Sequence, residues 1–166
     1  WKAINRNKKF ITLDLRLPEG LALFKQMIKG FDVLVENFRP GTLDRWGLTR
    51  EVLWELQPRL VILRATGFGQ TGPYRDRAGF ARLFEAMGGL TYITGEPEGA
   101  PMHTGYPMGD AIGGLFGTIG VLAALCRRVM EPDAPGEEID LSMTEAVLRL
   151  LDFLPMDALL WFTVAS

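Results

Sequence analysis

The chain has 166 residues, of which 48% are hydrophobic and 23% are charged, and its formal net charge is -2. This length suits one ordinary domain, the hydrophobic content excludes a disordered chain, and the slight negative charge disfavours nucleic acids and anionic membranes as partners. His103 is the sole histidine, so we expect no metal cofactor. Cys126 is the sole cysteine, so no internal disulfide is expected, and we predict a reducing, cytoplasmic location.

Strand-like and helix-like segments alternate along the first half of the chain. Short β-rich runs predict strands at residues 10–15, 31–35 and 60–63. Between them, Pro18 opens a predicted helix over 19–29, and Thr49 is placed to cap a second helix that ends before Pro58. Strands that alternate with helices are typical of a parallel sheet, so we predict an α/β fold.

Two glycine-rich stretches follow, at residues 66–79 and 95–107, and both are predicted to be loops, with a helix over 80–87 between them. A strand over 138–141 comes near the end, and Ser142 and Glu145 form a capping box for a helix that we expect to run through Leu160.

The longest uncharged run, 111–126, is shorter than the roughly 20 apolar residues of a membrane span. We therefore predict a buried helix from Asp110 to about residue 128, with Cys126 as core filler.

Motifs for common nucleotide and acyl chemistry were sought next. The sequence contains no G-x-G-x-x-G after a strand, no G-x-x-x-x-G-K-[ST] and no G-x-S-x-G. Dinucleotide binding, P-loop hydrolysis and serine-triad chemistry therefore have no support.

The most informative polar residue is Asp110, at the N-terminal end of the predicted apolar helix. It lies next to Gly109 and shortly before Gly113 and Gly114. An aspartate here is a preferred N-cap, and the same carboxylate is placed to act as a nucleophile. The two roles are compatible, because helix amides and the helix dipole favour the ionised form and the glycines leave room for a substrate. We expect Asp110 to be ionised with a low pKa.

Several segments resemble the class III coenzyme A transferases (the CaiB/BaiF family) in the same order and at the same spacing. They are N-R-N-K-K at 5–9 with I-T-L-D-L at 11–15, V-E-N-F-R-P-G at 35–41 with R-W-G-L at 45–48, G-F-G-Q-T-G-P-Y at 67–74 and R-A-G-F at 77–80. Asp110 falls at the nucleophilic aspartate of that family. The resemblance covers nearly the whole chain.

The resemblance implies an enzyme that moves coenzyme A from an acyl-CoA to a carboxylic acid through aspartyl anhydride and aspartyl-CoA thioester intermediates. It also implies contacts to CoA from Leu13, Arg16, Asn37, Phe38, Arg45 and Arg77. Its fold would be part of a Rossmann-like parallel-sheet domain with flanking helices. Family chains are much longer and form interlocked homodimers, so we expect residues 1–166 to be an internal fragment of the large domain, without its start and without the downstream small domain.

Two other functions stay open. A racemase branch of the same family uses a His-Asp pair where this chain has Phe80 and Ala81, and neither side chain can accept a proton, which disfavours racemase chemistry. His103 is expected to be a surface residue rather than a substitute base. A non-catalytic CoA-binding subunit is the other alternative. The apolar run 158–162 is either a dimer surface or part of a terminal core helix.

Overall fold

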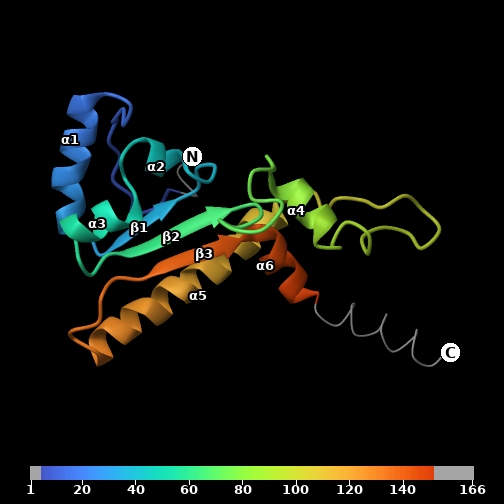
Figure 1. Ribbon diagram of the computed structural model, residues 1–166. Helices are drawn as coiled ribbons and strands as arrows, with labels where there is room; N and C mark the ends of the chain where they lie inside the picture. Colours follow the sequence, from blue (N-terminus) through green and yellow to red (C-terminus); the bar gives the residue numbers. More distant parts are fainter. Residues whose placement is uncertain (1–4, 152–166) are drawn as a thin grey trace.

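The computed structural model describes residues 5–151 and is built on a three-stranded sheet (Figure 1). The strands are β1 (Val33–Glu36), β2 (Val61–Thr66) and β3 (Glu138–Ser142), in the spatial order β1-β2-β3. Both pairs are parallel, with Val33 opposite Val61 and Ile62 opposite Glu138. The carboxyl ends of all three strands therefore lie at one edge of the sheet, and the predicted α/β fold is confirmed.

Six α-helices and one short 3-10 helix are found within the described residues. They are α1 (Pro18–Met27), η1 (Ile28–Gly30), α2 (Thr42–Arg45), α3 (Arg50–Leu56), α4 (Ala81–Met87), α5 (Met108–Met130) and α6 (Met143–Leu150). The Thr49 side chain accepts a hydrogen bond from the Val52 N–H, and the Ser142 side chain accepts one from the Glu145 N–H. Both predicted caps are confirmed.

The two faces of the sheet are covered differently. Ile62 of β2 packs on one face in a cluster with Ile28, Leu43, Leu48 and Leu53 from the region of η1, α2 and α3. Helix α5 packs on the other face, against β2 and β3, and is drawn below β3 in Figure 1.

Glycines bring α5 close to the sheet. A Cβ on Gly117 would lie 2.9 Å from Leu63 and 3.2 Å from Leu141, and one on Gly120 would lie 3.3 Å from Ile139. The small residues of this helix therefore have a packing role.

Only one side of α5 is covered by the described residues. Leu115, Ile119 and Leu122 are exposed, and so is Cys126. The prediction of a buried helix therefore holds only for the face of α5 that packs on the sheet. The prediction that Cys126 lies in the core was wrong, because Cys126 lies on the face that points away from the sheet. By length and mean hydropathy α5 also qualifies as a helix able to cross a membrane, as core helices of soluble proteins do.

Two local predictions were wrong. Residues 10–15 form no strand, because the Asp14 carboxylate accepts a hydrogen bond from the Arg16 N–H at 3.0 Å, a local turn that competes with strand pairing. Asp110 is not the N-cap of α5, because the helix begins two residues earlier, at Met108, after Pro107. The predicted end of the last helix and the run 158–162 lie outside the described residues.

Candidate active site

Asp110 is the third residue of α5 and lies at the carboxyl edge of the sheet. Helix α5 runs against the direction of the strands, since Gly113 is next to Met143, just after β3, while Gly120 is next to Ile139, near its start. The N-terminal turn of α5 thus meets the strand ends, which is where ligands bind in open α/β sheets.

A first cavity, called here the strand-end cleft, has a volume of about 330 Å³ and contains Asp110 in its lining. Residues after all three strands contribute: Asn37 and Phe38 after β1, Gly67 after β2 and Met143 after β3. The backbone at Phe38 is fixed, because its N–H donates to Glu36 Oε2 at 2.7 Å and its ring lies edge-on to Trp46. The parallel topology is the reason these separate segments meet.

A second cavity, called here the histidine pocket, has a volume of about 240 Å³ and lies between α4, the loop at 103–107 and the start of α5. It is lined by Phe80, Ala81, Arg82, Glu85, His103, Gly105, Tyr106, Pro107 and Asp110. Of these, only Phe80 and Asp110 also line the strand-end cleft. Asp110 therefore lines both cavities, and it also lines a third cavity of about 470 Å³ that extends along α5 to Leu63 and Leu122.

Glu85 is a buried carboxylate that contacts both the start of α5 and His103 in the histidine pocket. It is 1% exposed, its Oε1 accepts the Gly109 N–H at 3.1 Å, and its Oε2 lies 3.6 Å from His103 Nδ1. The hydrogen bond from the Gly109 N–H to Glu85 satisfies one of the backbone N–H groups that are free at the start of α5. Asp110 was expected to do this as the N-cap. His103 is exposed, as predicted for a surface residue, and its side chain lines this pocket.

The pKa of Asp110 is raised above its ordinary value, chiefly because partial burial disfavours the charged carboxylate and secondly because the Glu85 carboxylate repels it. The expected low pKa was wrong. Without the capping position, Asp110 makes no side-chain cap hydrogen bond that would stabilise its charge. A carboxylate that is less well solvated is also a stronger base and nucleophile once ionised.

The structure brings together half of the predicted CoA-contacting residues. Asn37, Phe38 and Arg77 line the strand-end cleft with Asp110, and the Arg77 guanidinium stacks 4.0 Å above the centre of the Tyr74 ring. Leu13, Arg16 and Arg45 do not line this cleft.

Two of these three have local partners. The Arg16 guanidinium pairs with Asp14 at 2.7 Å and lowers the pKa of that carboxyl to about 2. Arg45 Nη2 donates to Thr42 Oγ1 at 2.9 Å. Contact of all six residues with CoA stays a prediction.

Three cavity residues were missed from the sequence. Arg39 and Arg75 line the strand-end cleft; Arg39 lies inside the V-E-N-F-R-P-G motif but was not singled out, and no motif marked Arg75. Glu85 did leave a signal: it shares the spacing i, i+3, i+4, i+7 with Ala81, Phe84 and Gly88, all buried, so a carboxylate occurs on the apolar face of a helix.

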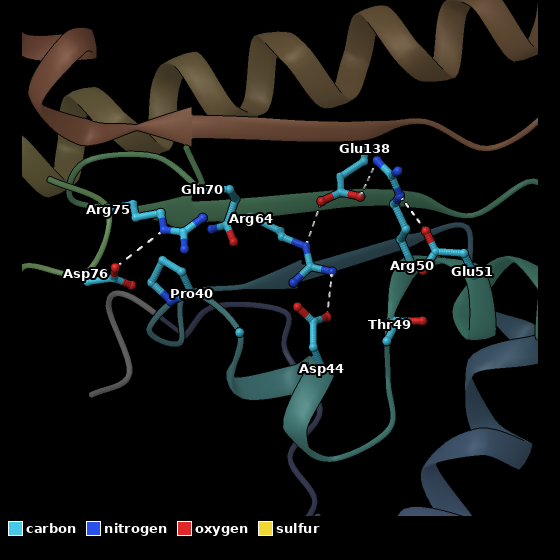
Figure 2. A pocket seen from close by; sticks show the side chains of 11 residues that line it. Pro40, Asp44, Thr49, Arg50, Glu51, Arg64, Gln70, Arg75, Asp76 and Glu138 are labelled. Atoms are coloured by element: carbon cyan, nitrogen blue, oxygen red, sulfur yellow. Dashed lines mark hydrogen bonds and ion pairs between the residues drawn. The ribbon is translucent and has the colours of Figure 1, made fainter. Parts of the chain in front are cut away.

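A buried charge cluster supports the loop after β1. Figure 2 shows Arg64 of β2 between Glu138 of β3 and Asp44 of α2, with Nε 2.8 Å from Glu138 Oε1 and Nη2 3.5 Å from Asp44 Oδ1. Arg64 Nη1 also lies 3.8 Å from Glu36, the residue that holds the Phe38 N–H. Burial raises the pKa of Glu36, and Arg64 partly opposes this effect. The cluster contains one residue from each strand, Glu36, Arg64 and Glu138, and Glu36 connects it to Phe38 at the strand-end cleft.

Across residues 5–151, no group of three or more His, Cys, Asp and Glu side chains is arranged to hold a metal ion.

These features define an α/β protein whose small-molecule site, centred on a carboxylate, lies at the carboxyl ends of parallel strands. The sequence model of CoA-transferase family III matches residues 1–165, and the chain belongs to this family.

The chain is similar to several characterised relatives. It is 50% identical over 153 residues to the succinyl-CoA--L-malate CoA-transferase beta subunit of Chloroflexus aurantiacus, covering 92% of this chain and 37% of that protein. It is 38% identical over 151 residues to the succinate--glutarate CoA-transferase of Agrobacterium fabrum, covering 91% and 37%.

A crystal structure of a CaiB/BaiF family protein from Brucella suis matches with a TM-score of 0.88 at 37% identity, over 93% of this chain and 40% of that one. The chain thus spans about two fifths of the length of these relatives or less.

Proposed function

We propose that the protein containing this chain transfers coenzyme A from an acyl-CoA to a carboxylic acid, with Asp110 as the nucleophile. The observation that carries the proposal is the position of Asp110, at the strand ends and in the lining of both the strand-end cleft and the histidine pocket. Membership of CoA-transferase family III supports the reaction class. The relatives named for succinyl-CoA with malate and for succinate with glutarate support an acid as the acceptor.

The proposed reaction has four steps at Asp110. Its carboxylate attacks the acyl-CoA carbonyl, the C–S bond breaks, and a mixed anhydride and CoA thiolate form. The thiolate attacks the Asp110 carbonyl, so the donor acid leaves and an aspartyl-CoA thioester remains. The acceptor carboxylate attacks this thioester, which gives a second anhydride and thiolate. The thiolate then attacks the acceptor carbonyl, which releases the new acyl-CoA and restores Asp110.

The strand-end cleft is the proposed path for CoA. Phe38 is held in place by Glu36 and Trp46, and Arg39, Arg75 and Arg77 add positive charge where phosphates would lie. The raised pKa of Asp110 suits a carboxylate that must attack a carbonyl, because a more basic carboxylate is a stronger nucleophile once ionised.

Activity of the complete protein tests this proposal. We expect Asp110→Ala to reduce transfer from an acyl-CoA to any of a panel of carboxylic acids by at least about a thousandfold. Asp133→Ala is the matched control, because Asp133 is exposed beyond the opposite end of α5. Full activity in Asp110→Ala would contradict the proposal.

One observation favours a second candidate function. His103 shares the histidine pocket with Asp110, so a histidine is present near the carboxylate even though Phe80 and Ala81 replace the racemase pair. Exchange of an acyl-CoA α-proton with deuterated solvent, in the absence of any acid acceptor, would indicate racemase chemistry. A CoA-binding subunit would instead bind CoA in calorimetry and give neither product.

The assembly and location of the complete protein are also proposals. The exposed apolar side chains of α5 include Leu115, Ile119 and Leu122, and an interlocked homodimer with a longer chain would cover such a face. We propose a cytoplasmic location, which a reduced Cys126 would suit.

A further inference from the structure

The transfer steps at Asp110 leave open where the acceptor acid binds, and the histidine pocket is suited to that role. It reaches Asp110 separately from the proposed CoA path, since the two cavities have only Phe80 and Asp110 in common. An acceptor acid must approach the aspartyl thioester from a direction that CoA does not fill. The histidine pocket offers that direction.

Arg82 supplies a positive charge to this pocket. It is exposed, and within residues 5–151 it forms no ion pair or hydrogen bond. Several other arginines are paired with carboxylates, for example Arg64 with Glu138 and Arg127 with Glu131 and Glu137. An unpaired guanidinium at the wall of a pocket is suited to bind a carboxylate in a bidentate manner.

His103 lines the same pocket as Arg82. Its Nδ1 lies 3.6 Å from Glu85 Oε2 and 3.5 Å from Thr91 Oγ1, so Nδ1 faces these two groups and Nε2 is the nitrogen left for a ligand. In the imidazolium form, with a proton on both nitrogens, Nε2 donates to a carboxylate. Glu85 itself is occupied by the Gly109 N–H, and at 1% exposure it is shielded from the pocket space. Apart from the reacting Asp110 and the buried Glu85, the residues that line the pocket are therefore cationic, neutral polar or apolar, and none of them is an exposed carboxylate.

We propose that Arg82 and His103 form a subsite for the second carboxylate of a dicarboxylic acid acceptor, while its first carboxylate reacts at Asp110. The inference rests on the proposed CoA transfer and names its acceptor class. A pocket of about 240 Å³ lies below the usual size of about 300–1,000 Å³ for drug-sized ligands, which suits a small diacid. Phe80, at the border of both cavities, would pack against the methylene chain between the two carboxylates.

Steady-state kinetics of the complete protein test the subsite, with glutarate and valerate compared as acceptors of equal carbon number. Arg82→Gln should raise the KM for glutarate at least about tenfold, the effect of losing one charged hydrogen-bonded contact, and leave the KM for valerate unchanged. His103→Gln should act in the same direction. Lys29→Gln is a charge-matched control, because Lys29 lies in η1, before the amino end of β1.

Two kinetic results would overturn the subsite: an unchanged KM for glutarate in Arg82→Gln, or an equal rise for both acids. If the wild-type protein transfers CoA to no acid, the proposed function fails, and calorimetry with glutarate then decides the subsite separately. Binding of glutarate that is lost in Arg82→Gln supports it, and no binding to the wild-type protein contradicts it.

Discussion

Asp110 experiences opposing influences within one helical turn. As the third residue of α5 it lies near free backbone N–H groups, which favour a negative charge. Its partial burial and the nearby Glu85 carboxylate both raise its pKa, and burial is the larger effect. Glu85 thus has two roles: it anchors the start of α5 through the Gly109 N–H, and it makes Asp110 more basic.

Glu85→Gln separates these two roles. Glutamine keeps an oxygen that can accept the Gly109 N–H but carries no charge, so the repulsion that raises the Asp110 pKa is removed. Because the nucleophile must be ionised, we expect the acidic limb of the kcat/KM profile to move to lower pH. Glu96→Gln, a change in the exposed loop, should leave the limb in place. A shift to higher pH, or none, would show that Glu85 does not act on Asp110 through its charge.

At the scale of one helix, the glycines of α5 differ in what surrounds them. A Cβ on Gly114 would meet nothing within 4 Å, so Gly114→Ala should raise the free energy of unfolding by roughly 0.5–1 kcal/mol through helix propensity. A Cβ on Gly109 would lie 3.0 Å from the Ala81 carbonyl oxygen, so Gly109→Ala should give no such gain. Urea denaturation of the two variants checks this, and equal stabilisation of both would contradict the close packing of α4 on α5.

Most of the helices and strands were predictable because their signals are local. Thr49 and Ser142 cap α3 and α6 as their side-chain chemistry requires, and the apolar runs of β1 and β2 fall in buried or half-buried strands. The start of α5 was not predictable, because the group that serves its Gly109 N–H comes from Glu85, 24 residues away. The single-turn α2 was too short to leave a periodic pattern.

The site was predictable only where a motif marked it. Asp110, Asn37 and Phe38 lie at one cleft, as the resemblance implied. Arg39, within the V-E-N-F-R-P-G motif, and Arg75, outside any motif, also line this cleft, and their place there depends on loop geometry. The pKa of Asp110 was predicted in the wrong direction, because desolvation depends on tertiary packing that a helix-terminus argument omits.

At the scale of the whole molecule, Arg64 connects the three strands through charge. It is 4% exposed and faces Glu36, Asp44 and Glu138, so it neutralises carboxylates on both neighbouring strands. Through Glu36 it also supports the Phe38 backbone at the site. Stability and site geometry therefore depend on the same side chain.

Arg64→Leu should reduce the free energy of unfolding by about 3–5 kcal/mol, since it leaves buried carboxylates without a partner. Acidification should lessen this deficit as Glu36, whose pKa is raised by burial, becomes protonated. Arg50→Leu, which removes the outer partner of Glu138, should change stability by no more than about 1 kcal/mol, because Arg50 is exposed. Thermal or urea unfolding at neutral and mildly acidic pH measures both, and similar effects of the two variants would show that the cluster is not effectively buried.

The central claim, that Asp110 becomes covalently modified, can be measured by chemical trapping in the complete protein. After incubation with acyl-CoA, hydroxylamine or borohydride is added and the peptide containing Asp110 is analysed by mass spectrometry. We predict an adduct on Asp110 that requires acyl-CoA and is absent in Asp110→Ala. An unmodified Asp110 peptide from protein that is turning over would contradict the account.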